Sequence, residues 1–233
     1  MSEAHEFRRP RGFRSLIPFP AWAALVQSGI VRKHHARERL LHQGEPGGWV
    51  LLCVSGRLKV IYSEPEGREL MLAVRGPGDV IGEFSGQDGR PRSATVQAIE
   101  PGVTSKLSDQ RFDDVVDRHG IRAQLNSYML GKVRESAPHA WRLAHRTTAA
   151  RLADLLVALI GAAGPDHPAP TTIPMSQEEL ATALGLVRSA VTPVLAEWKA
   201  AGLIQVSRAR LHVLDIPGLL DMHRGDVSTS GQN

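Results

Sequence analysis

The 233-residue chain contains one cysteine, Cys53, so no intrachain disulfide can form. A single thiolate is also too few for a thiolate zinc site or an iron–sulfur cluster. No run approaches about eighteen consecutive apolar residues, because the longest, at positions 152–163, is broken by Asp154 and Gly161. The chain therefore lacks the features of a disulfide scaffold or a membrane-spanning protein. We predict a cytoplasmic protein without a membrane partner.

Neither charge sign dominates: 28 Lys and Arg residues face 24 Asp and Glu residues, which gives a net charge of +4. The sequence pI of about 9.6 is compatible with a polyanionic partner. The N-terminal segment carries several arginines interrupted by Pro10, Pro18 and Pro20, and no apolar signal-peptide core follows. We predict a disordered basic arm at residues 1–20, and the remaining length allows two small domains.

Eleven of the 22 glycines lie between Gly44 and Gly102, among short apolar and β-branched runs. Turn signals rich in glycine and proline separate these runs. Candidate strands occupy residues 49–54, 57–63 and 69–74, and Pro65-Glu66-Gly67 would turn the hairpin between the last two. The pattern predicts an antiparallel jelly roll, or β-roll, at residues 21–120.

The period of the apolar pattern changes at Ile121. Apolar residues then recur every three or four positions, through Leu125, Met129, Val133, Ala137, Ala140 and Ala144. They would share one face of a long helix at residues 121–146. This stripe either covers the β-roll or pairs with a second copy of the chain as a dimer seam. Pro138 removes a backbone hydrogen bond, so we expect a kink there.

A second domain is predicted at residues 147–222, followed by a tail at 223–233. Thr147 and Thr148 can cap its first helix, whose leucines face a separate core. Ser176-Gln177-Glu178-Glu179 has the form of a capping box, in which the serine oxygen and the second glutamate satisfy each other's backbone N–H groups. The helix that begins there would end at Gly185, and another would begin near Val187 or Arg188.

Helix, glycine turn and helix in this order indicate a helix-turn-helix, and residues 203–214 predict a β-wing behind it. The alternative is a helical hairpin that only packs. We expect DNA contacts from Ser176, Gln177, Arg188, Ser189, Thr192, Arg208 and Arg210. Of these, Arg188 is the best base-reading candidate, and the two wing arginines suit phosphates. Pro193 costs a helix interior roughly 3 kcal/mol unless it falls within the first turn, so the helix is expected to start late or bend.

Two parts of the sequence resemble a known family. Gly82-Glu83-Phe84-Ser85 followed by Arg92-Ser93-Ala94-Thr95-Val96 is similar to the phosphate-binding cassette of cyclic-nucleotide-binding domains. Together with the helix-turn-helix, this points to the cyclic-AMP receptor protein and fumarate-nitrate regulator (Crp/Fnr) family, over roughly residues 20–222. The resemblance implies an α+β protein with an N-terminal cyclic-nucleotide-binding β-roll, a long dimerisation helix and a C-terminal winged helix-turn-helix.

By this resemblance, Glu83 would hold the ribose 2′-hydroxyl and Arg92 the cyclic phosphate of cyclic AMP or cyclic GMP. The predicted ligand-binding set is Gly82, Glu83, Phe84, Ser85, Arg92, Ser93, Ala94 and Ser136. In the cyclic-AMP-responsive branch of the family, two polar residues of the long helix contact the adenine. Ser136 and Ala137 stand at these positions, so one polar contact is kept and the other is lost. Free N–H groups at a helix start and a forked guanidinium suit a phosphate. The alternative is that Glu83 and Arg92 form only an ion pair.

Ser189 and Pro193 replace a glutamate and an arginine that are common in the family, so its usual DNA half-site does not carry over. The implied protein is a homodimeric transcription regulator on a twofold-symmetric operator in double-stranded DNA, with RNA polymerase as a possible further partner. A second hypothesis keeps DNA binding but makes it ligand-independent or responsive to another small molecule.

A third hypothesis is a metal-dependent jelly-roll enzyme that uses His34, Glu38 and His42. The adjacent His34 and His35 would point to opposite faces of a strand, which does not match the His-x-His spacing of such sites. We therefore predict no catalytic residue, no metal and no enzyme activity.

Overall fold

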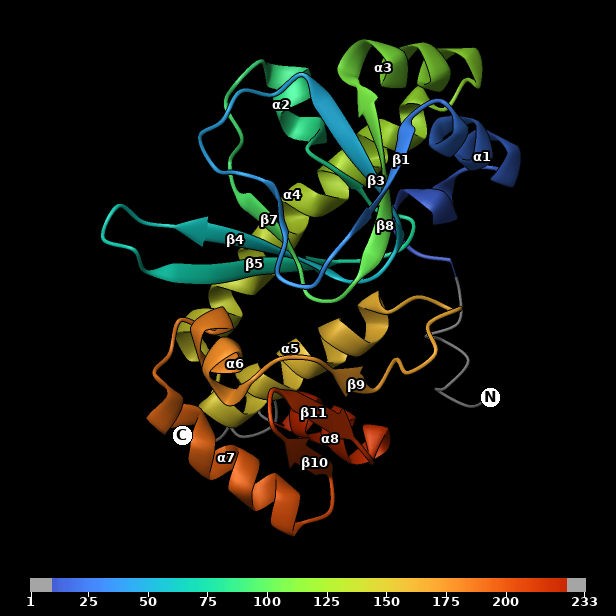
Figure 1. Cartoon of the computed structure of the whole chain (residues 1–233). Helices are drawn as coiled ribbons and strands as arrows, with labels where there is room; N and C mark the ends of the chain where they lie inside the picture. The colour runs from blue at the N-terminus through green and yellow to red at the C-terminus, as the bar shows by residue number, and fades with distance from the viewer. Residues whose placement is uncertain (1–9, 226–233) are drawn as a thin grey trace.

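The computed structural model describes residues 10–225, and side chains within residues 10–222. Figure 1 shows a β-roll, a long helix that runs behind it, and a smaller domain of helices and short strands below. The β-roll contains β1 (Ile30–His34), β2 (Arg39–Leu41), β3 (Trp49–Ser55), β4 (Leu58–Ser63), β5 (Glu69–Arg75), β6 (Val80–Ile81), β7 (Thr95–Ala98) and β8 (Gly102–Ser108). The short helix α2 (Glu83–Asp88) follows β6, and α3 (Asp109–Arg118) follows β8.

The strands of the β-roll form two antiparallel sheets, with the orders β1-β8-β3-β6 and β2-β7-β4-β5. The hairpin β4–β5 turns at Gly67, where a φ of 85° favours glycine. Cys53, Leu58 and Ala98 are completely buried between the sheets. The apolar runs seen in the sequence therefore supply the inner faces, and the predicted α+β class with an N-terminal β-roll is confirmed.

The N-terminal segment differs from the predicted disordered arm. Residues Phe13–Leu16 form a 3₁₀ helix, and α1 (Phe19–Gln27) begins directly after Pro18. Phe13 is completely buried, and its ring lies 5.6 Å from that of Tyr128. The prediction followed the arginines and prolines and missed the apolar anchor between them. Positions 1–9 of the predicted arm lie outside the described residues.

The long helix is α4 (Arg122–His145), and its two halves have different surroundings. In the first half, Leu125 and Tyr128 are buried in the core of the β-roll. After Tyr128, Leu130 and Val133 are 57% and 55% exposed. Ala137, Ala140 and Ala144 in the second half are exposed as well. The first part of the apolar stripe thus covers the β-roll, whereas the second part is left open to solvent in the single chain.

The C-terminal domain begins with a capped helix, since Thr147 Oγ1 accepts from the N–H of Ala150 at 3.2 Å. Its elements are α5 (Thr148–Ala162), β9 (Thr172–Ile173), α6 (Gln177–Ala183), α7 (Arg188–Ala200), β10 (Ile204–Ser207), β11 (Arg210–Val213) and α8 (Ile216–Gly225). The three strands form one antiparallel sheet in the order β10-β11-β9. Helix α8 extends to Gly225, whereas the tail was predicted to begin at residue 223, and residues 226–233 lie outside the described part.

The β-roll and the C-terminal domain share one hydrophobic cluster. Met71, Val74 and Ile99 of the β-roll are buried together with Leu155 and Leu184 of the C-terminal domain. Apolar burial stabilises by roughly 25 cal/mol per Å². This shared cluster therefore holds the two domains in one arrangement.

A buried ion pair reinforces the same junction. The side chain of Arg57 is inaccessible to solvent and donates to both carboxylate oxygens of Glu100, at 2.8 and 2.6 Å. It also donates to the carbonyl oxygens of Leu159, Pro170 and Thr172, at 3.4, 3.3 and 2.7 Å. Because these three carbonyls belong to the C-terminal domain, one guanidinium ties that domain to the β-roll.

Within residues 10–225, no single helix is both long enough and apolar enough to cross a membrane. Helices α6 and α7 meet the length and composition requirement only as a pair, and the pair is bent by 117°.

Candidate functional site

A cavity of about 450 Å³ lies between the β-roll and α4. All eight residues of the predicted ligand-binding set line it: Gly82, Glu83, Phe84, Ser85, Arg92, Ser93, Ala94 and Ser136. Seven of them come from the segment that contains α2 and the loop after it, and Ser136 comes from α4. The volume is within the range of small-molecule pockets.

Gly82 shapes the entry to α2. Its φ of 87° is left-handed, and a Cβ at this position would lie 2.6 Å from Nη1 of Arg92. Only glycine allows the backbone to approach the guanidinium this closely. The hydroxyl of Ser85 returns to the carbonyl oxygen of Gly82 at 3.1 Å. The first turn of α2 therefore lies directly beside Arg92, with its free N–H groups at the cavity.

Arg92 is only 4% exposed, and internal acceptors already hold it. Nη1 donates to the Gly82 carbonyl at 2.6 Å and to Ser85 Oγ, and Nη2 donates to the Trp49 carbonyl at 2.5 Å. The guanidinium also lies over the Trp49 ring, 5.0 Å from its centroid, while Lys106 approaches the same ring at 4.0 Å. Burial lowers the pKa of Arg92. Its Nε is buried and has no hydrogen-bond partner among the described residues.

Glu83 is 3% exposed and forms an ion pair that the sequence analysis missed. Lys132 of α4 donates to Oε1 of Glu83 at 2.7 Å and to the carbonyl oxygen of Val80 at 2.6 Å. Burial lowers the pKa of Lys132, and the Glu83 carboxylate opposes that shift. The partner of Glu83 is therefore Lys132, and the alternative of a Glu83–Arg92 ion pair is wrong.

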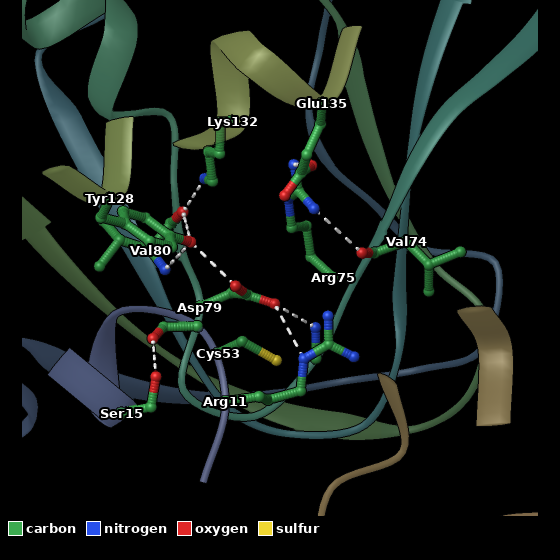
Figure 2. A network of polar contacts seen from close by, with 12 residues as sticks. Arg11, Ser15, Cys53, Val74, Arg75, Asp79, Val80, Tyr128, Lys132 and Glu135 are labelled. Carbon is green, nitrogen blue, oxygen red and sulfur yellow. Dashed lines mark hydrogen bonds and ion pairs between the residues drawn. The ribbon is translucent and has the colours of Figure 1, made fainter. Parts of the chain in front are cut away.

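Figure 2 shows how Lys132 continues, through the carbonyl oxygen of Val80 and the hydroxyl of Tyr128, into a buried polar network. The hydroxyl of Tyr128 donates to Oδ1 of Asp79 at 2.9 Å. Oδ2 of the same carboxylate accepts from the N–H of Gly76 at 2.8 Å, and the guanidinium of Arg11 lies 3.8 Å away. Burial raises the pKa of Tyr128 well above its usual range, so this hydroxyl stays protonated. The network connects α4 to the N-terminal segment.

Further residues of α4 line the cavity beside Ser136, namely Lys132, Glu135, His139 and Leu143. Their spacing of three or four places them on one helical face. The apolar stripe of this helix was predicted from the sequence, but its polar face was not. The recurrence of Lys132, Glu135 and His139 at spacings of three and four is the sequence signal that could have identified these residues. Ser136 itself donates to the carbonyl oxygen of Val133 at 2.6 Å.

The helix-turn-helix has the predicted local geometry. The capping box is confirmed, because Ser176 Oγ accepts from the Glu179 N–H at 3.1 Å and Glu179 Oε2 accepts from the Ser176 N–H at 2.8 Å. Gly185 follows with a φ of 65°, which lets the chain turn sharply. Helix α7 then begins at Arg188. Figure 1 shows α7 at the outer edge of the molecule, away from the β-roll.

Five of the seven predicted DNA-contacting residues are exposed, whereas Ser176 and Gln177 at the start of α6 are half-buried. Arg188, Ser189 and Thr192 are exposed on the first turns of α7. Thr192 Oγ1 lies 3.4 Å from Oε1 of Gln177, so the starts of α6 and α7 meet. The wing residues Arg208 and Arg210 are exposed at the β10–β11 turn.

The two helical prolines do not end their helices. Helix α4 continues through Pro138, and α7 continues through Pro193. Pro193 is the sixth residue of α7, so the prediction that this helix starts late is wrong. Because a proline has no N–H, the carbonyl oxygen of Ser189 loses its usual helical donor. That oxygen lies on the exposed side of the helix.

Glu179 also makes an ion pair with the β-roll. Arg37 donates to its two carboxylate oxygens at 2.9 and 3.3 Å. Burial raises the pKa of Glu179, but the bonds from Arg37 and Ser176 outweigh it and lower the pKa to about 2. The stabilisation is therefore fully present above the ordinary pKa near 4.5 and is lost as the pH falls toward 2.

We expect Arg37→Ala to raise the pKa of Glu179 and to destabilise the protein at pH 7 by less than about 1 kcal/mol, since Arg37 is largely exposed. The difference from the wild type should shrink as the pH falls from about 4.5 to about 2. Urea unfolding at several pH values and NMR titration of the carboxyl group measure both effects. Arg68→Ala, which removes an exposed pair within the β4–β5 hairpin, is the matched control. An unchanged Glu179 pKa in Arg37→Ala would contradict the assignment.

The residues of the metal-enzyme hypothesis do not form a metal site. Among the residues that the structure describes, no group of three or more His, Cys, Asp and Glu side chains could hold an ion. His34 is buried, Glu38 binds Arg32 at 2.5 Å, and His42 is exposed. The hypothesis of a metal site built from His34, Glu38 and His42 is therefore wrong.

Comparison with known families matches both parts of the chain. The model of the cyclic nucleotide-binding domain matches residues 31–119, and that of the Crp-like helix-turn-helix domain matches residues 150–222. The CRP-like cAMP-activated global transcriptional regulator of Mycobacterium tuberculosis is 28% identical over 176 residues, which are 74% of this chain and 79% of that protein. The transcriptional activator protein anr of Pseudomonas aeruginosa is 28% identical over 181 residues, 76% of this chain and 74% of that protein.

Solved structures show the same fold. The c-di-GMP responsive global regulator CLP of Xanthomonas campestris aligns with a TM-score of 0.68 at 21% identity, over 85% of this chain and all of that one. A CRP-family transcriptional regulator from Thermus thermophilus also aligns with a TM-score of 0.68, at 23% identity, over 83% of this chain and 96% of that one.

Proposed function

Because the chain belongs to the Crp/Fnr family of transcription regulators, we propose that it acts as a homodimer controlled by a cyclic nucleotide, with cyclic AMP as the first candidate. The observation that carries this proposal is the single cavity lined by all eight residues of the predicted ligand-binding set. Arg92 would hold the cyclic phosphate beside the first turn of α2. Cyclic AMP ranks first because several similar regulators are named as activated by it.

Two features support ligand control through α4. Lys132 and Ser136 bring this helix to the edge of the cavity, and Lys132 holds the carboxylate proposed to bind the ribose. A ribose hydroxyl that donates to Glu83 would either replace the hydrogen bond from Lys132 or add a second one to the same carboxylate. Either change acts on α4, whose exposed Leu130, Val133 and Trp141 are the proposed seam to a second copy. A bound nucleotide would thereby bias the position of the DNA-binding domains.

The direct test is a calorimetric titration of the purified protein with cyclic AMP and with cyclic GMP. We expect one nucleotide per chain and tighter binding of cyclic AMP. Tighter binding of cyclic GMP would reassign the ligand. Binding of neither would contradict nucleotide control and favour the second hypothesis, a DNA-binding regulator that is ligand-independent or senses another small molecule. The internal acceptors that already hold Arg92 are the observation in favour of that hypothesis.

For DNA binding, Arg188→Ala and Arg208→Ala should have different effects. Arg188 at the start of α7 is proposed to read a base edge, so its loss should reduce discrimination between operator and random duplex by roughly 1–3 kcal/mol. Arg208 in the wing is proposed to meet a phosphate, so its loss should weaken both duplexes about equally and lower the salt slope by about one. Fluorescence anisotropy at several salt concentrations separates the two. Equal loss on both duplexes for Arg188→Ala would refute its base-reading role.

The operator would be twofold symmetric if the protein is a homodimer. A cytoplasmic location and a contact with RNA polymerase remain predictions of this role.

A further inference from the structure

A second cavity of about 440 Å³ lies between the β-roll and the C-terminal domain. Its walls come from β5, α4, α5 and the end of α6. It adjoins the 450 Å³ cavity proposed to bind the nucleotide, which we call the nucleotide cavity. The two share six lining residues, namely Leu72, Ala73, Arg75, Glu135, His139 and Leu143. The helix-turn-helix enters the wall through Leu184, directly before its glycine turn. We call this space the interdomain cavity.

The charges that line the interdomain cavity are not balanced. Arg75 pairs with Glu135 at 2.9 Å, and Arg142 lies 3.6 Å from Asp154. Arg151 lines the same cavity without a carboxylate partner among the described residues. Arg11 also lines the cavity and lies 3.8 Å from Asp79, which is outside the lining. Four lining arginines therefore face two lining carboxylates, and Asp154 has a closer partner in Arg146, at 2.6 Å.

Arg151 is therefore the group that lacks a counter-ion. It donates to the carbonyl oxygen of Leu184, and its Nε is buried with no hydrogen-bond partner among the described residues. Burial lowers its pKa, which is the signature of a guanidinium taken from water without compensation. A buried donor without a partner is destabilising, and more so when it is charged. An anion in the cavity would remove that destabilisation.

His139 adds a second open hydrogen-bonding position. Its Nε2 is also buried and unpaired within the described part of the chain. Burial lowers its pKa, and the neighbouring Arg142 and Arg151 lower it further. The ring is therefore neutral at physiological pH and offers a donor or an acceptor to a ligand.

The remaining wall of the interdomain cavity is apolar, with Met71, Val74, Leu143, Leu155 and Val157. A hydrocarbon body fits such a wall, whereas a bare inorganic anion leaves it unfilled. We propose that the interdomain cavity is a second effector site, which binds a small amphipathic anion, a carboxylate or monophosphate head on an aliphatic body, with Arg151 as its counter-ion.

A ligand at this site would directly affect the orientation of the DNA-binding domain relative to the β-roll. A ligand in the interdomain cavity touches the β-roll, α4 and the end of α6 at once. It therefore stabilises one arrangement of the two domains. Since Arg75, Glu135 and His139 also line the nucleotide cavity, the two ligands would change each other's affinity by the same factor. The site itself does not depend on the nucleotide proposal.

Calorimetry on the full chain with octanoate, octyl phosphate and the neutral octanamide tests this site. We expect one octanoate or octyl phosphate per chain, with the tighter of the two identifying the head group, and octanamide at least tenfold weaker. Ala158→Phe should abolish binding, because Ala158 is exposed and lines the cavity, so the larger ring fills the space without entering the core. Ala200→Phe, an exposed alanine of α7, is the matched control and should bind like the wild type.

Cyclic AMP distinguishes the two cavities. With rising nucleotide concentration, the octanoate affinity should reach a plateau, as coupling between separate sites requires. A decrease without a plateau would mean that octanoate enters the nucleotide cavity, and the proposal would be wrong. Equal binding of octanamide, unchanged binding in Ala158→Phe, or no binding of either anion would also overturn it.

Discussion

Arg92→Ala is expected to weaken the binding of cyclic AMP by about a hundredfold, which corresponds to ~2.7 kcal/mol. A charged hydrogen bond to a phosphate contributes about 1.5–3 kcal/mol, and this guanidinium is the proposed phosphate partner. Its Nη1 and Nη2 already donate to the carbonyl oxygens of Gly82 and Trp49, and a phosphate would share or replace these bonds. Calorimetric titration of the variant gives the change in affinity.

Two control variants sharpen the result for Arg92. Arg90→Ala removes an exposed arginine of the same loop that does not line the cavity, and should bind like the wild type. Arg92→Lys keeps the charge but loses the forked geometry, so its affinity for cyclic AMP should lie between those of Arg92→Ala and the wild type. Thermal unfolding of each variant separates lost folding from lost binding. If a folded Arg92→Ala variant binds cyclic AMP as tightly as the wild type, the proposed role of Arg92 is refuted.

The second large effect is expected at the junction of the two domains. Glu100→Ala should destabilise the protein by about 3–5 kcal/mol, because it leaves the guanidinium of Arg57 buried without its carboxylate. The carbonyl oxygens of Leu159, Pro170 and Thr172 still accept from this guanidinium, but they carry no full charge. Urea unfolding of wild type and variant measures the loss.

A matched control is available on the surface. Glu64→Ala removes an ion pair of 2.7 Å with Arg68 that is largely exposed, and should cost less than about 1 kcal/mol. The double variant Arg57→Met with Glu100→Leu should recover much of the loss, because apolar replacement of both partners removes the unpaired charge. A loss in Glu100→Ala as small as that in Glu64→Ala would mean that the pair is not desolvated.

Local rules explain why much of the fold was predictable. The capping box at Ser176, the glycine turn at Gly185 and the start of α7 depend on a few adjacent residues, and all three are present. The strands at residues 49–54, 57–63 and 69–74 were predicted within one residue at each end. Alternation and turn chemistry determine such elements without distant partners.

The partners of buried charges were not predictable in this way. Lys132 meets Glu83 across 49 positions of sequence, and Arg57 meets Thr172 across 115. Neither spacing leaves a local pattern. Phe13 was hidden among arginines and prolines for the same reason, since its anchor depends on Tyr128. These contacts exist only after the two domains and α4 have come together.

The hydrophobic cluster shared by β5 and the C-terminal domain limits how this protein can be divided. A fragment consisting of residues 147–222 alone would expose Leu155 and Leu184 where Met71 and Val74 now cover them. Such a fragment would tend to self-associate rather than behave as a free DNA-binding module. In the intact chain, unfolding of either domain would expose the apolar residues of the other domain that it now buries. Heating should therefore melt both together in a single calorimetric transition.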